Sequence, residues 1–169
     1  MNRVYALFLV AVLTAAGFVP VPILEIRDAR QGKTVFAQRI SPGASFSLEF
    51  IHSVEKSPVT DFFRVDGDYR IVLYETAFRS LNTGLPATLS EGERLARTEQ
   101  GFRLSIPDRV IPEIQLWANR QYAGVLTIGS RRMPLSDLAG DTLLQLRVRK
   151  VPFGEYAFQS LTGRANHQK

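Results

Sequence analysis

Hydrophobic and polar residues alternate one by one through much of the chain that follows Ile23. Successive side chains of a β-strand point to opposite faces, so a period of two predicts strands. The clearest example is Ser45–Glu55, where one face would carry Phe46, Leu48, Phe50, His52 and Val54. This pattern constrains the fold more than any other feature of the sequence, because it leaves little room for helices.

Further strands are predicted over Thr34–Ile40, Val59–Val65, Tyr69–Thr76, Phe102–Ile106, Ile114–Ala118, Tyr122–Ile128 and Leu143–Val151. Asp66-Gly67-Asp68 is typical of a tight hairpin turn. Asn119-Arg120-Gln121 is also short, which predicts a hairpin over Ile114–Ile128. Beyond Pro22 no ten-residue stretch has a clean apolar stripe at helical spacing, although Leu135–Leu138 could form a single helical turn. The expected fold is all-β, an antiparallel sandwich or a partly open barrel.

The N-terminus has the layout of a secretory leader: a polar start with Arg3, an apolar run over Val4–Val19, and small residues before Pro20. We expect residues 1–22 to form a hydrophobic helix that acts as a signal peptide or as an N-terminal membrane anchor. The apolar run is short for a permanent anchor, because a spanning helix needs about 20 residues. A buried core helix is the alternative. The leader predicts an extracytoplasmic, periplasmic-side location, either secreted across the cytoplasmic membrane or anchored to it.

The remainder is expected to form one β domain over residues 23–162, followed by a flexible tail over residues 163–169. The segment Arg79–Gln100 contains Gly and Pro residues and ends in charges, so it is expected to be an irregular excursion of the kind that often carries function. A flexible loop with one irregular strand is the alternative interpretation.

Composition removes several classes of function. The chain has no cysteine and only two histidines, which excludes disulfide frameworks, thiolate zinc sites, iron–sulfur clusters and cysteine nucleophiles. No metal site and no cofactor is expected. The formal charge of +5 is compatible with an anionic membrane surface. Aromatic residues are not interleaved with the basic ones, so nucleic-acid binding is not expected.

The densest group of reactive side chains lies between Phe50 and Asp61. His52, Glu55 and Asp61 are the candidate catalytic residues: His52 could act as a general base, oriented by a carboxylate, with Ser53 or Ser57 attacking. Strand alternation places His52 and Glu55 on opposite faces unless a bulge or the turn at Pro58 intervenes. The alternative is that His52 points inward as a hydrogen-bonded core residue.

A row of polar side chains, Gln145, Arg147 and Arg149, shares one face of a predicted strand. Arginines in such a row can pair with carboxylates or phosphates. The alternative is a solvated strand face.

Several motifs together resemble the Domain of Unknown Function 1850 family: His52-Ser53-Val54-Glu55, Pro58-Val59 with Asp61 and Phe62, the strand Arg70–Thr76, and Gly84-Leu85-Pro86. The resemblance covers roughly Ile26 to Val151. Two departures affect loop geometry. Asp61 stands where glutamate is expected, and Ser80-Leu81-Asn82-Thr83 lacks an expected glycine.

The resemblance brings no established activity with it, but it implies a role. Members of the family are small bacterial proteins with a hydrophobic N-terminus, often encoded beside TRAP-type transporters that use TAXI solute receptors. This implies a non-catalytic accessory or binding module whose partner is the transporter membrane subunit or the solute receptor. The expected binding residues are His52, Ser53, Glu55, Pro58, Asp61, Gly84, Leu85 and Pro86.

Two other classes of function stay open. One is a small extracytoplasmic ligand-binding or hydrolytic domain that uses His52 and Glu55, and it requires their side chains to converge in one pocket. The other is a structural envelope protein without a small ligand.

Overall fold

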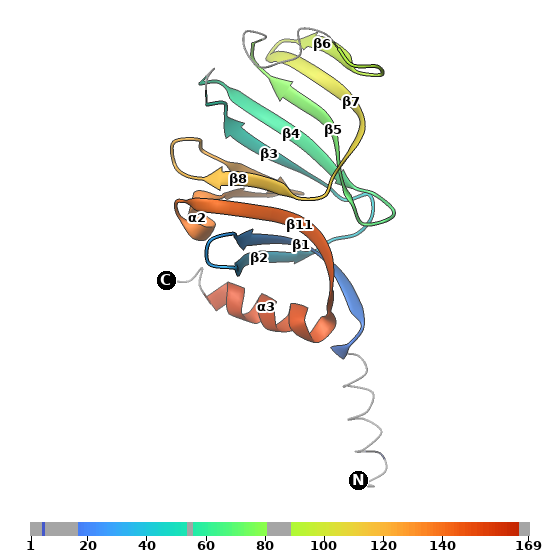
Figure 1. Cartoon of the computed structure of the whole chain (residues 1–169), viewed down its shortest axis with the longest axis vertical. Coiled ribbons are helices and arrows are strands. Elements are labelled where there is room, and N and C mark those ends of the chain that lie inside the picture. Colours follow the sequence, from blue (N-terminus) through green and yellow to red (C-terminus); the bar gives the residue numbers. More distant parts are fainter. Residues whose placement is uncertain (1–4, 6–16, 54–55, 81–88, 166–169) are drawn as a thin grey trace.

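The computed structural model describes residue 5 and residues 17–53, 56–80 and 89–165. Most of the predicted leader therefore lies outside the described residues, together with the helix expected there. No helix in the described part is long and apolar enough to cross a membrane. The strands are joined into two antiparallel sheets, and neither sheet closes into a barrel (Figure 1). The all-β, antiparallel expectation is confirmed at this level.

The smaller sheet has the order β2-β1-β11-β8. Its strands are β2 (Lys33–Arg39), β1 (Pro20–Asp28), β11 (Thr142–Pro152) and β8 (Ile114–Ala118). The first and last described strands thus pair with one another at its centre, along the whole length of β1. β8 occupies one edge, and it pairs with β11 alone.

The larger sheet has the order β10-β9-β3-β4-β5-β7-β6. Its strands are β10 (Arg131–Pro134), β9 (Val125–Ile128), β3 (Ser45–Ile51), β4 (Pro58–Val65), β5 (Ile71–Phe78), β7 (Gly101–Ile111) and β6 (Arg94–Thr98). The predicted turn at Asp66–Asp68 joins β4 to β5 as a hairpin. The Asp66 carboxylate accepts hydrogen bonds from the backbone N–H groups of Asp68 and Arg70.

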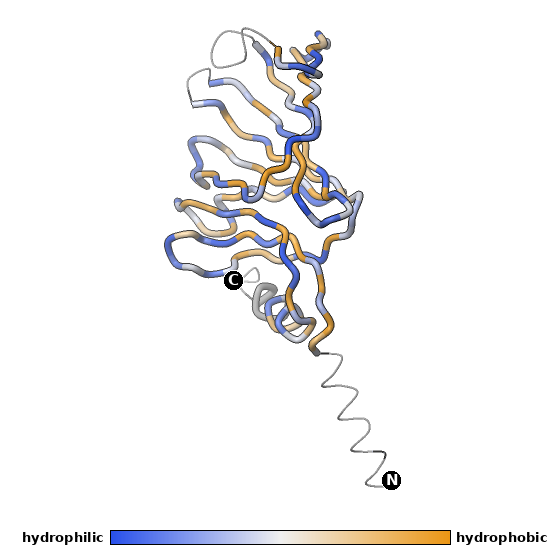
Figure 2. Tube along the Cα trace, turned by 45° about the vertical axis from the view of Figure 1, so that its right-hand side comes forward, coloured by the Kyte–Doolittle hydropathy of each residue, from blue (hydrophilic) through white to orange (hydrophobic). Residues whose placement is uncertain are grey.

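One hydrophobic cluster forms between the two sheets. Leu24 and Ile26 of β1 contribute from the smaller sheet, and Leu48 of β3 and Phe63 of β4 contribute from the larger one. The alternation along the strands is visible in Figure 2. The predicted alternation therefore accounts for this core, because each strand directs one of its two faces toward the other sheet.

Two short helices complete the described fold: α2 (Ser136–Ala139) and α3 (Phe153–Ala165). α2 matches the expected helical turn. α3 was not predicted, and it packs on the smaller sheet on the side away from the core, over Ile23 and Val151 (Figure 1). Its apolar residues make no clean stripe because part of its buried face is polar. Residues 163–165 of the predicted tail belong to α3, and residues 166–169 lie outside the described residues.

The predicted hairpin over Ile114–Ile128 is wrong. β8 pairs with β11 of the smaller sheet, whereas β9 pairs with β3 and β10 of the larger one. The connection between them crosses from one sheet to the other, and the Asn119 side chain fixes it by accepting a hydrogen bond from Tyr122 N. β1 begins at Pro20, within the range predicted for the leader.

Candidate functional site

A cleft opens where the edge strand β8 faces the inner side of β3 and β4. Its volume is about 430 Å³, within the range of natural ligand sites. The lining is mostly apolar and aromatic, with a few polar groups: Leu48, Phe50, Ile51, His52, Ser53, Asp61, Ile114, Gln115, Leu116, Trp117, Tyr122 and Gly124. Three of the predicted site residues, His52, Ser53 and Asp61, therefore lie in one cleft.

Asp61 lies on the inner face of β4. It stands opposite Leu48 in the register with β3 and opposite Thr76 in the register with β5, and both of these residues are buried. Its carboxylate accepts a hydrogen bond of 2.7 Å from the Thr76 hydroxyl. Burial raises the pKa of Asp61 above its ordinary value, and the Thr76 hydrogen bond opposes this only in part. The cleft thus contains a carboxyl group that has lost much of its hydration, and the hydrogen bond from Thr76 replaces only part of it.

His52 lies directly after β3, in a tight turn that leads to β4. Its backbone N–H donates to Ser57 O at 2.9 Å, and Lys56 N donates back to His52 O at 2.9 Å. Lys56 adopts a left-handed backbone conformation, with φ of 51°, which lets the turn close. His52 is half-buried and lines the cleft. Glu55 lies outside the described residues, and the predicted pairing of Glu55 with His52 therefore falls outside them too.

Trp117 comes from β8 and stands at the opposite side of the cleft. Its indole N–H donates to the Asp141 carboxylate, and the Arg30 guanidinium lies 4.9 Å from the ring centroid. The side chain is 38 % exposed. Sequence reasoning missed Trp117, although a lone tryptophan in a short edge strand is a detectable signal.

The other predicted binding residues are not brought into this cleft. Pro58 lines a second, more polar hollow of about 730 Å³ on the outer face of the larger sheet, together with Thr60 and Arg103. Gly84, Leu85 and Pro86 lie outside the described residues. Of the irregular segment Arg79–Gln100, residues 94–98 form β6, which matches the alternative of one strand within an excursion.

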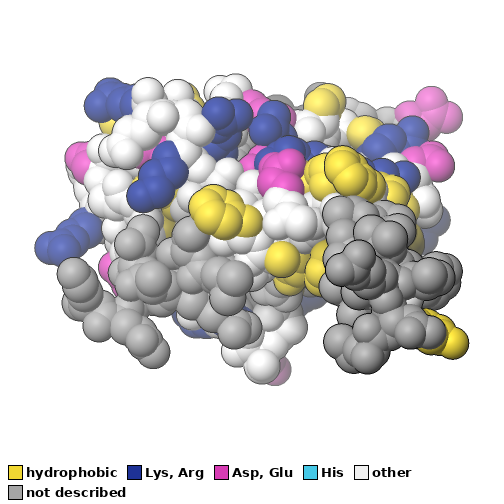
Figure 3. Space-filling view, turned by 90° about the horizontal axis from the view of Figure 1, so that it is seen from below, with side chains coloured by type: hydrophobic (Ala, Val, Ile, Leu, Met, Phe, Trp, Pro, Cys, Tyr) yellow, Lys and Arg dark blue, Asp and Glu magenta, His cyan; other side chains and the backbone are white. Residues whose placement is uncertain are grey.

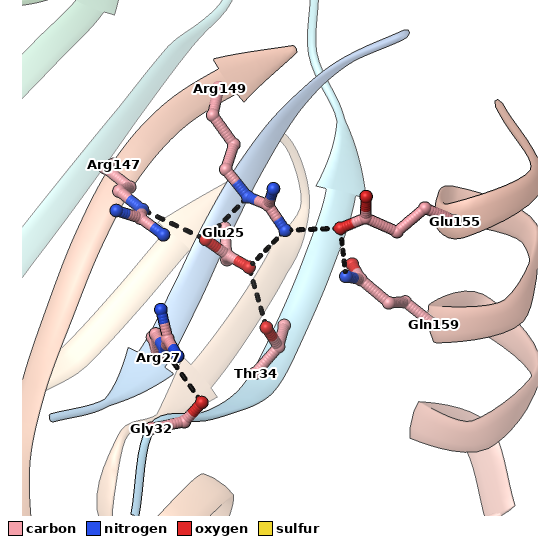
Figure 4. Close-up of polar contacts among 8 residues, drawn as sticks. All are labelled: Glu25, Arg27, Gly32, Thr34, Arg147, Arg149, Glu155 and Gln159. Carbon is pink, nitrogen blue, oxygen red and sulfur yellow. Dashed lines mark hydrogen bonds and ion pairs between the residues drawn. The ribbon is translucent and has the colours of Figure 1, made fainter. Parts of the chain in front are cut away.

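A second polar cluster lies on the opposite side of the smaller sheet, under α3 (Figure 4). Glu25 of β1 is only 1 % exposed. Its carboxylate accepts hydrogen bonds from Arg147 at 3.0 Å, from Arg149 at 2.9 and 3.0 Å, and from the Thr34 hydroxyl at 2.7 Å. Arg149 also reaches Glu155 of α3 at 2.6 Å.

This cluster settles the role of the arginine row. Burial by itself would raise the pKa of Glu25, but the hydrogen bonds from Thr34, Arg149 and Arg147 outweigh it and lower the pKa below the ordinary value. The arginines pair with a buried carboxylate, as one reading of the row expected, and the alternative of a solvated strand face is wrong. Because every oxygen of Glu25 is engaged by this chain, the cluster fastens α3 to the sheet rather than offering a ligand site.

Among the described residues, no group of three or more His, Asp or Glu side chains could hold a metal ion. A family model described as a domain of unknown function (DUF1850) matches residues 46–135, just over half of the chain. The chain belongs to this family. The DUF1850 match runs from β3 to the end of β10, and it is shorter at both ends than the resemblance noted above. It includes His52, Asp61 and Trp117, but not Glu25 or α3.

No curated protein matches this chain, and no solved structure matches it either. For this DUF1850 protein, function has to be argued from the site itself.

Proposed function

We propose that this protein is an exported, membrane-proximal accessory module that binds a partner through the cleft between β8 and the β3–β4 pair. The proposed partner is a subunit of a TRAP-type transporter, either the membrane subunit or its TAXI solute receptor. The residues proposed to bind are His52, Ser53 and Asp61, with Trp117 added from the structure.

The main support for this proposal is the composition of the cleft. Predicted site residues from the turn after β3 and from β4 meet the edge of the smaller sheet, where β8 has backbone hydrogen bonds to β11 on one side only. In the described part of the chain, no other strand pairs with β8. An unpaired edge beside apolar walls favours recognition of another chain over chemistry.

Proximity to a membrane is supported by the end of the molecule at which β1 begins. Phe153 N donates to Val19 O at 2.9 Å, so the start of α3 lies beside the start of β1. Phe18, Val19, Phe153 and Phe158 are large hydrophobic residues that are largely exposed here. Figure 3 looks onto this end and shows hydrophobic side chains beside Lys and Arg side chains, a combination suited to a lipid interface.

The location has a direct test. An alkaline phosphatase domain that is active only outside the cytosol is fused after Lys169, with and without residues 1–19. Activity that depends on residues 1–19 is the expected result. Activity of a cytosolic reporter fused at the same place would contradict export.

The partner has a second test. Tagged protein is purified from native membranes and the co-purifying transporter subunits are quantified for the wild type, for His52→Ala and for Trp117→Ala. We expect both variants to lose most of the partner while their melting temperatures stay close to that of the wild type. Glu49→Gln, on the outer face of β3, is the matched control. Equal recovery with all four proteins would remove the cleft as the binding site.

A hydrolytic role is the second candidate, and it is favoured by one observation: His52 and Asp61 line the same cleft. Against it, the described partner of the Asp61 carboxylate is the Thr76 hydroxyl rather than a base or a nucleophile. Hydrolysis of p-nitrophenyl acetate by the wild type that is lost in His52→Ala would support this candidate. Equal hydrolysis rates for the wild type and His52→Ala would dismiss it.

A further inference from the structure

The Asp61 carboxylate differs from the other acidic groups that are shielded from water in the described chain. Glu25 is paired with two arginines, and Glu93 is paired with Arg109. Asp28 has no ion pair in the described chain, but its carboxylate accepts three hydrogen bonds, from the backbone N–H groups of Arg30 and Gln31 and from the Thr142 hydroxyl. Asp61 forms no ion pair with any described residue and has one neutral hydrogen-bond donor, the Thr76 hydroxyl. A carboxylate in such surroundings is costly unless a cation compensates it.

Two cations lie over aromatic residues of the cleft lining. Lys56 Nζ lies 6.0 Å from the ring centroid of Tyr122, and the Arg30 guanidinium lies over Trp117. Both aromatic rings line the cleft, but neither cation belongs to the lining. The cleft therefore combines an inward carboxylate with apolar and aromatic walls, and its lining supplies no lysine or arginine to balance the charge.

We propose that the cleft receives a cationic nitrogen on an apolar stem, with the charge held by Asp61 and the stem packed against Phe50, Ile114 and Leu116. This rests on the proposed function in one respect, namely that the cleft is a binding site. The cation is a protonated amine or a guanidinium. It can come from a free amine or from a lysine or arginine side chain of the partner protein.

The position of β8 favours the partner protein as the source. Four consecutive residues of this edge strand, Ile114–Trp117, line the cleft. An extended segment placed along the edge would pair with the backbone of β8 and would direct every second side chain toward the inner face. One of these side chains would reach Asp61.

Trp117 is the only tryptophan of the chain, so its fluorescence reports occupancy of the cleft. The probe is phenethylamine, and its neutral counterpart is phenethyl alcohol. We expect phenethylamine to give a saturable change with the wild type and to bind at least tenfold more weakly to Asp61→Asn. Phenethyl alcohol should also bind at least tenfold more weakly than the amine.

Asp61→Glu keeps the charge and should retain amine binding, and Glu49→Gln is the control on the opposite face of the sheet. Melting curves show that each variant is folded. The proposal is overturned if phenethylamine leaves the wild-type fluorescence unchanged, if Asp61→Asn binds it as tightly as the wild type, or if the alcohol binds as well as the amine.

Two peptides distinguish the sources. One is acetyl-Val-Phe-Lys-Phe-Val-amide, and the other has the same sequence with methylated backbone nitrogens at both phenylalanines. Tighter binding of the first peptide than of the amine, reduced by methylation, assigns the cation to an extended protein segment. A peptide no better than the amine assigns it to a free ligand, and both results uphold the role of Asp61.

The inference and the proposed function fail in different ways. If Asp61→Asn still co-purifies the transporter subunit but no longer binds the amine, the cation is not what the partner supplies. If amine binding is intact while no variant of the cleft affects co-purification, the cleft binds a ligand and the partner proposal falls.

Discussion

Glu25 and Asp61 are both carboxylates that strands shield from water, yet their surroundings are opposite. Glu25, on the outer face of the smaller sheet, is covered by α3 and accepts hydrogen bonds from two arginines and a hydroxyl. Asp61, on the inner face of the larger sheet, accepts a hydrogen bond from one hydroxyl beside an open cleft. The pKa of Glu25 is lowered and that of Asp61 is raised.

This difference separates stability from binding. A carboxylate whose partners all come from its own chain contributes to the fold, and its loss would remove an ion-pair partner from both half-buried arginines. A carboxylate that is desolvated without a cation costs stability, which is a frequent property of functional sites. The predictions below test the contrast in order of decreasing effect.

Glu25→Gln should give the largest loss. The two arginines would face a neutral amide, and we expect unfolding free energy to fall by about 2–3 kcal/mol, less than for fully buried pairs because both arginines are one-third exposed. For a chain of this size the melting temperature should drop by roughly 4–12 °C. Urea denaturation measures the change, and an effect no larger than that of an exposed ion pair would contradict the structural role of the cluster.

The contribution of Glu25 should also depend on pH. Because its folded pKa lies below the ordinary value of 4.5, its stabilising effect is present above pH 4.5 and is lost as the pH falls through the folded pKa. The stability gap between the wild type and Glu25→Gln should therefore close in acid. Urea midpoints from pH 7 downward measure it, and a gap that stays constant would refute the assignment.

Asp61→Asn should act in the opposite direction. The amide keeps a hydrogen bond to Thr76 and removes a desolvated charge, so we expect a gain of roughly 0.5–1 kcal/mol at neutral pH. The folded pKa lies above the ordinary value of 3.8, so the wild type should match the variant below pH 3.8 and fall behind as the pH rises through the folded pKa. A destabilised variant at neutral pH would show that Asp61 has a cationic partner within the chain.

Glu49→Gln should have the smallest effect. Glu49 pairs with Arg132 at 2.9 Å, and both side chains are substantially exposed, at 39 % and 58 %. Exposed pairs contribute little to stability, so we expect no change beyond the error of the measurement. The same urea series measures it, and a larger loss would place this pair with the Glu25 cluster rather than at the surface.

Local patterns in the sequence were sufficient for most strands and for the Asp66–Asp68 turn, because alternation and turn chemistry act over a few residues. They failed for the connection after Ala118, where a short turn changes sheets instead of folding back. They also failed for α3, which is held partly by Glu155 and Arg149 rather than by an apolar stripe.

The sites divide in the same way. His52, Ser53 and Asp61 could be found together because they are close in sequence. The role of Arg147 could not be resolved, because its partner Glu25 is 122 residues away and only the register between β1 and β11 brings them together. Trp117 belongs to the cleft for a similarly non-local reason.

The pairing of β1 with β11 has a consequence for how the chain acquires its shape. The smaller sheet has its two central strands at opposite ends of the sequence, so it cannot assemble while the polypeptide is incomplete. Long-range pairing of this kind makes folding slow. Until residue 152 has been synthesised, the nascent chain lacks a complete β11. The smaller sheet can therefore form only after this strand is available.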